Sequence, residues 1–434
     1  MKFFGCFLLS FVIFHTTENK ILQDSSLGLN EIAYHNEPSL IFLGAPSIVR
    51  LSTGRLLVSH EYFTLPGYKP LPNVTVYASD DNGQSWSFLS NITYTYFNSL
   101  FIYKEVLYAI GIANELNGAT VIHRSNDNGL TWTYNGSDKG VVLFTEQFQG
   151  GVTPVVIAND ILYHATEYWP PPYHFPQSYQ AAMISCNLST ANSLTDDEDP
   201  LMNPNNWKIT PRLSFNDSWI PKSYPHLDAP GFLEGNAVIV QKPDSNEYRV
   251  LNIIRFNSVP LSNLAIVLEL NQTTNTLSFV SIINFPGGMT KFVIRYDPIT
   301  KAYYSLVNPV TIPKYASQRN ILSLSYTKDL VNLSEWKILV DRLLYDDTGL
   351  AEEDSIHYTG FHYVDWQFDQ LTASKHNSSC IEWNCDGGSD IIYGIRTGYR
   401  GANTFHNSNR ITHKNLTNYR QLFWEKEKNN EFVH

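Results

Sequence analysis

The feature that most constrains this chain is an eight-residue segment that occurs twice. The copies are residues 79–86, Ser-Asp-Asp-Asn-Gly-Gln-Ser-Trp, and residues 125–132, Ser-Asn-Asp-Asn-Gly-Leu-Thr-Trp, which start 46 residues apart. Each copy has the chemistry of a hairpin turn, because Asp accepts turn amides, Asn-Gly adopts positive φ and Trp packs beneath. A weaker echo runs from Ser325 to Trp336. One unit of about 45 residues cannot bury its own faces, so the repeat predicts a ring of units, a β-propeller.

The remaining sequence also predicts strands. Short β-branched and aromatic runs alternate with Asn, Asp, Gly and Pro turns, which is the all-β pattern; examples are residues 47–51, 74–77, 107–110 and 237–240. No amphipathic helix longer than two turns is expected. Aromatic residues make up 14% of the chain and charged residues only 16%, a balance that suits both β-sheet cores and surfaces that stack on sugars.

The repeated segment resembles the Asp box, or BNR repeat, of the sialidase superfamily. The resemblance covers residues 30–420 and implies one all-β domain, a six-bladed β-propeller of the sialidase type. In that family the Asp boxes lie on outer turns away from the active site, so they indicate the fold and not the chemistry. Residues 421–434 are charged and lack glycine, and we expect them to form a polar C-terminal tail.

The start of the chain predicts secretion. Residues 1–19 contain Lys2, an apolar run over 3–14 and then polar residues, which is the layout of a secretory signal peptide. The run is too short to cross a membrane, although an N-terminal anchor or a buried strand is the alternative. Nine N-glycosylation sequons support a secretory route; they begin at Asn73, Asn91, Asn135, Asn187, Asn216, Asn271, Asn332, Asn377 and Asn415. We therefore expect an extracellular or secretory-lumen protein with no transmembrane segment after processing.

Charge and cysteine content limit the partners. The net charge is −11 and no basic run stands out, so nucleic acid is not an expected partner. Cys380 and Cys385 are expected to close a small loop disulfide; the alternative is a metal site, but no second ligand pair lies nearby. Cys186 is expected to be buried and free. We expect a monomer without a cofactor or a catalytic metal.

Two acidic residues occupy equivalent places in the first half of the chain. Glu61 and Glu167 each stand five residues after a hairpin Leu and precede two aromatic residues. The innermost strands of a propeller line a central funnel, so both carboxylates are candidates to face a ligand; the alternative is a solvated rim. Glu61, with His60 beside it, can act as a general acid if burial raises its pKa. Glu167 and His60 are expected to bind substrate.

The second half of the chain resembles the sialidase active-site segments. Glu234 in 231–238, Arg255 at the end of an apolar run, Arg319 before 321–325 and Tyr363 in 360–366 match in order. The resemblance implies that Tyr363 is the nucleophile, that Glu234 is its base and that Arg255 and Arg319 bind a sugar carboxylate. Sialidases use this pattern in place of the usual two carboxylates. A plain salt bridge for Arg255 and a core position for Tyr363 are the alternatives.

The first segment departs from the family. Where the family has Arg-Ile-Pro, whose Arg completes a clamp of three arginines, this chain has Gly44-Ala45-Pro46. No Asp lies between Pro46 and Ser79, so Glu61 is the one carboxylate in that stretch. Lys291 and His406 are added as possible binders, although their segments, 285–292 and 400–409, read equally well as turns.

These features predict a secreted glycoside hydrolase that releases a terminal acidic sugar from a glycan or glycoconjugate with retention of configuration. Activity on sialic acid itself is left open by the missing Arg. Two alternatives remain. One is a carbohydrate-binding propeller without catalysis. The other is a glycan lyase that uses Tyr363 with His362 or His406.

Overall fold

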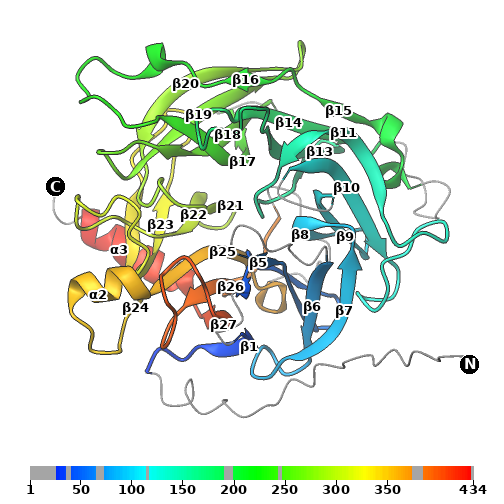
Figure 1. The fold of residues 1–434 in the computed structure, drawn as a ribbon, viewed down its shortest axis with the longest axis horizontal. Helices are drawn as coiled ribbons and strands as arrows, with labels where there is room; N and C mark the ends of the chain where they lie inside the picture. Colours follow the sequence, from blue (N-terminus) through cyan, green and yellow to red (C-terminus); the bar gives the residue numbers. More distant parts are fainter. Residues whose placement is uncertain are drawn as a thin grey trace, which may run out of the picture.

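The computed structural model describes residues 26–35, 41–64, 73–113, 117–189, 199–242, 247–373 and 385–431. The expected signal peptide, Asn377 and Cys380 lie outside these residues. Antiparallel sheets dominate the molecule and are arranged around a central axis, as Figure 1 shows. The expected all-β fold is therefore confirmed.

Three four-stranded sheets are each built from strands in chain order, and only the first omits a strand, β5 (Tyr62–Thr64). The first, ordered β3-β4-β6-β7, contains β3 (Ser47–Arg50), β4 (Leu56–His60), β6 (Asn73–Ser79) and β7 (Ser87–Thr93). The second contains β17 (Gly231–Gln241), β18 (Tyr248–Asn257), β19 (Leu264–Asn271) and β20 (Thr276–Asn284). The third contains β21 (Val293–Asp297), β22 (Ala302–Val307), β23 (Ile321–Thr327) and β24 (Lys337–Tyr345).

A fourth sheet joins the two ends of the described chain. It contains β25 (Gly360–Phe368), β26 (Ile391–Gly398), β27 (Arg410–Leu416) and β1 (Asn30–Tyr34). Strand β1 pairs with β27 on its outer edge, so residues far apart in sequence complete one sheet. This pairing protects an edge strand and fastens the beginning of the ring to its end.

A nine-stranded sheet fills the remaining arc. It contains β8 (Tyr96–Tyr103), β9 (Val106–Ile112), β10 (Gly118–Ser125), β11 (Val141–Gln149), β12 (Val156–Ala158), β13 (Ile161–Tyr168), β14 (Gln180–Asn187), β15 (Trp207–Ile209) and β16 (Leu213–Ser214). Its two halves are joined where β11 pairs with β13 over only two residue pairs. A two-stranded sheet of β2 (Ile41–Leu43) and β5 (Tyr62–Thr64) stands apart. In the described part of the chain, four short 3-10 helices connect elements: η2 (Pro200–Met202), η3 (Pro204–Asn206), η4 (Asp217–Trp219) and η5 (Gln370–Thr372).

The two repeated turns have the same hydrogen bonds. In the first, the Asp81 carboxylate accepts from the Ser85 amide at 2.9 Å, and Asn82 has φ 60°. In the second, the Asp127 carboxylate accepts from the Thr131 amide at 2.9 Å, and Asn128 has φ 60°. The predicted turn chemistry is thus confirmed. The weaker echo differs, because Asp329 there accepts from the Val331 and Asn332 amides.

The core lies between neighbouring sheets. Trp132 of the second turn is 4% exposed and packs with Leu57 and Leu107, so it fills the space between the first sheet and β9. Trp336 is also 4% exposed and packs with Val267 and Phe292. Burial of each large apolar side chain contributes about 1.5–3 kcal/mol. Each sheet is therefore stabilised by the faces of its neighbours, as a ring requires.

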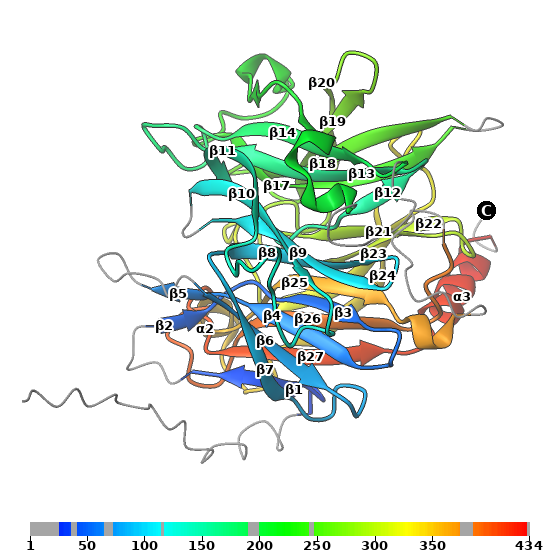
Figure 2. The same cartoon turned by 90° about the vertical axis from the view of Figure 1, so that its right-hand side faces the viewer.

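Helix α3 (Tyr419–Glu431) corrects the expectation that no helix exceeds two turns, because it has 13 residues. It occupies most of the segment that we expected to be a polar tail. Tyr419 and Phe423, four residues apart, are fully buried against Tyr304. The helix lies beside β24 in both views (Figure 1, Figure 2). A second helix, α2 (Glu352–Tyr358), precedes β25.

The cysteines agree with expectation as far as they are described. Cys186 is buried and free, and Cys385 is disulfide-bonded, while its expected partner Cys380 is outside the described residues. Among the described helices, none is both long and apolar enough to cross a membrane.

Candidate functional site

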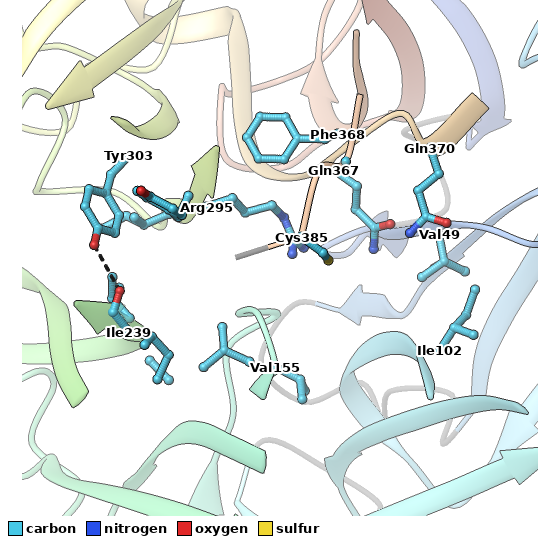
Figure 3. Close-up of a pocket in the computed structure, with 16 residues that line it drawn as sticks. Val49, Ile102, Val155, Ile239, Arg295, Tyr303, Gln367, Phe368, Gln370 and Cys385 are labelled. Carbon is cyan, nitrogen blue, oxygen red and sulfur yellow. Dashed lines mark hydrogen bonds between the residues drawn. The ribbon is translucent and has the colours of Figure 1, made fainter. Parts of the chain in front are cut away.

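The candidate residues lie at one end of the strands nearest the axis, and a cavity lies at the other end of the same strands. The later residues of β3, β8, β17, β21 and β25 line one small central cavity, which Figure 3 shows with Val49, Ile102, Ile239 and Arg295 around it. The earlier residues of β17 and β25, with the segments before β3 and β21, carry the candidate site. The two repeated turns lie at the cavity end, because Ser79 and Ser125 pair with the starts of β4 and β9. They are therefore remote from the site.

Two β-bulges project the central pair of side chains. The register of β17 against β18 shifts between Leu233 and Gly235, and Glu234 has φ 61°. The register of β25 against β26 shifts between His362 and Asp365, and Tyr363 has φ 50°. Bulges re-aim side chains and are common beside active sites. A positive φ is uncommon at Glu and Tyr residues, and backbone conformations of this kind cluster at functional sites.

Arg255 connects these two side chains. Its Nη1 donates to the Glu234 Oε2 atom at 2.7 Å and lies 3.4 Å from the Tyr363 hydroxyl. Its Nε donates to the Met289 carbonyl at 2.8 Å. The salt bridge considered as the alternative for Arg255 is thus present, and Tyr363 joins it. Burial raises the pKa of the Tyr363 hydroxyl, and the nearby Glu234 charge raises it further, so the phenol is neutral and needs a base to become a nucleophile.

Two further arginines lie against the Tyr363 ring. The guanidinium carbons of Arg319 and Arg396 are 5.5 Å and 5.3 Å from the ring centroid. Arg319 Nη1 donates to His362 Nδ1 at 2.7 Å, and Arg396 Nη2 donates to the His406 carbonyl at 2.7 Å. Both side chains are buried, and the Nε atom of each has no hydrogen-bond partner among the described residues. Buried cations without counterions are costly, so this cluster favours an anionic ligand.

Sequence reasoning missed Arg396. It follows the apolar residues Ile391, Ile392 and Ile395 in β26, which is the same pattern that identified Arg255. A charged residue inside an apolar strand needs a partner or a function. The sequence signal for Arg396, an arginine in an otherwise apolar strand, was therefore present.

Glu61 is fully buried close to this cluster. Its Oε1 accepts from the Ala45 amide at 2.7 Å, and its Oε2 has no hydrogen-bond partner within the described chain. Burial raises the pKa of Glu61 to about 7, while the positive charges of Arg396 and Lys291 oppose the shift. A protonated Glu61 is therefore available near neutral pH as a proton donor.

Gly44 explains the departure from the Arg-Ile-Pro pattern. A Cβ atom at position 44 would overlap the carboxyl group of Glu61. A larger side chain there would therefore require the Glu61 carboxyl group to move from its observed position. Arg50, the first arginine after Gly44 in the sequence, is remote from the cluster. It pairs with Asp369 at 2.6 Å.

Glu167 lies next to Glu234. Its Oε1 accepts from the Gly235 amide at 2.9 Å. Burial raises the pKa of Glu167 to about 7, and the negative charge of Glu234 raises it further. The structure therefore brings Glu167, Glu234, Arg255, Arg319 and Tyr363 together.

The remaining candidates lie at the margin. His60 is buried within its sheet, with its ring 5.7 Å from that of Tyr77, and burial lowers its pKa to about 4. Lys291 is buried and donates to the Val364 carbonyl at 2.8 Å, so it lies against β25 at the residue after Tyr363. His406 is exposed, and its ring centroid is 6.2 Å from that of His362.

The His362 ring can be assigned a tautomer from its neighbours. Since Arg319 donates to its Nδ1, its Nε2 carries the hydrogen toward the Ser408 hydroxyl at 3.1 Å. Burial, reinforced by the charges of Arg319 and Arg396, lowers the pKa of His362 far below its usual value. His362 is thus neutral and holds Arg319 in place. Within the described residues, no group of three or more His, Cys, Asp or Glu side chains is arranged to hold a metal ion.

Comparison with known proteins supports the fold but gives no close relative. No protein-family model matches the sequence, and no curated protein matches it. The Penicillium chrysogenum α-L-arabinanase complexed with arabinobiose is similar in structure, with a TM-score of 0.52, 12% identity and coverage of 89% of this chain and 96% of that chain.

Sialidases are similar to the same extent. A Hadza microbial sialidase has a TM-score of 0.51 and 11% identity, and the match covers 88% of this chain and 67% of the other. The Trypanosoma rangeli sialidase in complex with sialic acid has a TM-score of 0.51 and 12% identity, with 92% of this chain and 60% of that one covered. The chain therefore shares its fold with this arabinanase and these sialidases.

Proposed function

We propose that this protein is a secreted glycoside hydrolase that removes a terminal anionic sugar from a glycan. The observation that carries the proposal is the Tyr363 hydroxyl, 3.4 Å from the Arg255 guanidinium that is ion-paired with Glu234. Arg319 and Arg396, on the ring of the same tyrosine, complete a cluster of three arginines. Three cations with only one ion-paired carboxylate suit a substrate that brings its own negative charge.

The proposed reaction proceeds in two displacements. Tyr363 bonds to the anomeric carbon while Glu234 accepts the phenolic proton, and the glycosidic bond breaks as Glu61 protonates the leaving oxygen. Water, deprotonated by Glu61, then displaces Tyr363, which recovers its proton from Glu234. Two inversions give retention of configuration. A neutral phenol approaches an anionic sugar without the repulsion that a carboxylate nucleophile would meet.

We also propose that the ring has six blades. The nine-stranded sheet divides into β8–β11 and β12–β16, because only two residue pairs join β11 to β13. Each half then begins with a strand that borders the central cavity, as Ile102 and Val156 do. With β3, β17, β21 and β25 of the four four-stranded sheets, six inner strands surround the axis.

Hydrolysis of a neutral sugar is the second candidate. The Glu167 carboxyl, bonded to the amide next to Glu234, gives the site a second buried carboxylate. Paired carboxylates are the commoner machinery of glycoside hydrolases. Two proteins of similar fold are named as an α-L-arabinanase and an α-L-arabinofuranosidase. A neutral sugar therefore has to be tested as a substrate as well.

The test is hydrolysis of fluorogenic glycosides of sialic acid, glucuronic acid and α-L-arabinofuranose. We expect the wild type to release an acidic sugar, and Tyr363→Phe and Glu234→Gln each to lower kcat by about 10² or more. Tyr77→Phe, a half-buried tyrosine on β6, is the matched control. Full activity in Tyr363→Phe would refute the acidic-sugar mechanism, and loss of arabinosidase activity in Glu167→Gln alone would favour the second candidate.

Secretion is proposed on the expected signal peptide and sequons. Eight of the nine sequon asparagines belong to the described residues and none of these is buried; the exposed ones are Asn91, Asn135, Asn187, Asn216, Asn271 and Asn332. Expression in eukaryotic cells should therefore give a protein in the medium whose mass falls on enzymatic removal of N-glycans. An intracellular, unmodified product would contradict the proposal.

A further inference from the structure

The loop between β13 and β14 carries four aromatic side chains in mutual contact. Trp169 stacks on Tyr179, with ring centroids 5.1 Å apart and planes within 5°. Tyr173 meets the edge of Trp169 at 5.5 Å, and Phe175 meets Tyr179 at 6.0 Å. Tyr173 and Phe175 are 40% and 56% exposed. We call these four residues the aromatic platform. Neighbouring exposed aromatics of this kind are a sign of an interaction site.

Hydrogen bonds hold the platform in one conformation. The Trp169 amide donates to the Gln147 carbonyl at 3.0 Å, and the Tyr173 hydroxyl donates to the Gln147 side chain at 3.2 Å. Further along, the His174 amide donates to the Ser178 hydroxyl at 3.0 Å, and the Ser178 amide returns a bond to the His174 carbonyl at 2.8 Å. A surface fixed before binding loses little entropy when a ligand arrives.

The platform begins at the candidate site and leads outward from it. Trp169 follows Glu167 by two residues, and the Pro176 carbonyl packs so closely on Gly231 that a Cβ there would lie 2.7 Å away. Gly231 starts the strand that carries Glu234. Tyr179 is 2% exposed. Burial raises the pKa of its hydroxyl, and the nearby charges of Glu234 and Glu167 raise it further. The aromatic side chains thus run from beside the carboxylates to the exposed ring of Phe175.

We infer that the aromatic platform binds the sugar on the leaving-group side of the bond that is cleaved. This inference rests on the proposed function, because the arginine cluster takes the terminal anionic sugar and leaves the platform for the next residue of the glycan. The C–H faces of a pyranose are apolar and pack on aromatic rings, while the Tyr173 hydroxyl offers a polar edge. The occupant is therefore a neutral sugar ring, continuous with the substrate in the arginine cluster.

The experiment compares 3′-sialyllactose with methyl α-sialoside, which has no second sugar, and a glucuronyl disaccharide with methyl glucuronide. Phe175→Ala is expected to raise KM for the disaccharide or trisaccharide about tenfold and to leave the methyl glycosides unchanged. Phe175→Tyr should restore the wild-type KM. Phe88→Ala, 59% exposed on β7, is the matched control and should behave as wild type on all four sugars.

The outcomes separate the platform from the proposed reaction. Equal KM values for wild type and Phe175→Ala on the longer sugars would overturn the platform and leave the reaction intact. If the wild type cleaves none of the four, titration calorimetry with the same sugars decides. Binding of the longer sugars that Phe175→Ala loses and Phe88→Ala keeps would support the platform while refuting the reaction. Binding of none of them, or self-association that Phe175→Ala abolishes, would overturn the platform.

Discussion

At the scale of single residues, the bulges at Glu234 and Tyr363 and the three arginines define the candidate site. Sequence patterns identified Glu234, Arg255, Arg319 and Tyr363, and the structure brings these four together. Bulges and positive φ angles could not be predicted, because they depend on the exact register between paired strands, which the residue pattern does not specify. The role of Gly44 was equally hidden, since the residue it accommodates, Glu61, lies between β4 and β5 and is not a neighbour in the sequence.

Replacement of Arg396 tests the arginine cluster. Arg396→Lys keeps the charge but loses the planar fork that binds a carboxylate through two hydrogen bonds. We expect KM for an acidic glycoside to rise about tenfold or more, with a smaller change in kcat. Arg249→Lys, on the same strand as Arg255 but paired with Glu269, should leave KM unchanged. An Arg396→Lys variant with wild-type KM would exclude Arg396 from substrate binding.

Gly44→Ala tests the packing of Glu61. The added methyl group overlaps the Glu61 carboxyl, so the free energy of unfolding should fall by about 1–3 kcal/mol. In a Glu61→Ala background the same change should cost much less, because the space is then empty. Gly150→Ala, where the added Cβ meets its nearest atom at 3.6 Å, is the control for urea denaturation. Additive costs in the double variant would contradict the proposed packing.

At the scale of elements, the strands and the two repeated turns were predictable because their signals are local. Turn chemistry fixed Asp81 and Asp127, and alternating apolar runs fixed the sheets. Helix α3 was missed, since its buried stripe consists mainly of Tyr419 and Phe423 among charged residues. Such a helix is stabilised by tertiary packing more than by its own sequence.

Adjacent substitutions in α3 test that explanation. Phe423→Ala removes a fully buried ring that packs on Tyr304 and Tyr326 and should lower the free energy of unfolding by about 3–5 kcal/mol. Trp424→Ala changes a side chain that is 47% exposed and should stay within about 0.5–1 kcal/mol. Chemical denaturation of the two variants measures the difference. Equal effects would show that α3 does not dock as described.

At the scale of the whole molecule, the ring gathers residues from distant parts of the chain into one buried site. The repeat predicted such a ring, but it could not reveal that β1 would pair with β27 or that the last sheet would contribute Arg396. Burial in the ring also changes proton affinities. Both Glu61 and Glu167 have a pKa raised to about 7 by burial.

These raised pKa values make stability depend on pH in a defined direction. The protonated form of Glu61 is favoured in the folded state, so its contribution is complete below the unfolded pKa of 4.5 and is lost as pH rises through about 7. Relative to wild type, Glu61→Gln should therefore gain roughly 3 kcal/mol between pH 4.5 and pH 8. Both proteins contain the same buried histidines, whose contributions to the free energy of unfolding rise with pH. Subtracting the wild-type value from that of the variant removes these contributions. Glu335→Gln, an exposed side chain, should show no such gain, and a flat difference for Glu61→Gln would refute the burial of its charge.

We propose above all that Tyr363 is the nucleophile of a retaining glycoside hydrolase. Incubation with a fluorinated acidic glycoside that slows the second displacement should leave the sugar attached to the protein. Peptide mass spectrometry is then expected to find the sugar on Tyr363, and Tyr363→Phe should carry none. A sugar attached to Glu167 or Glu234, or turnover with no attached sugar at all, would contradict the claim.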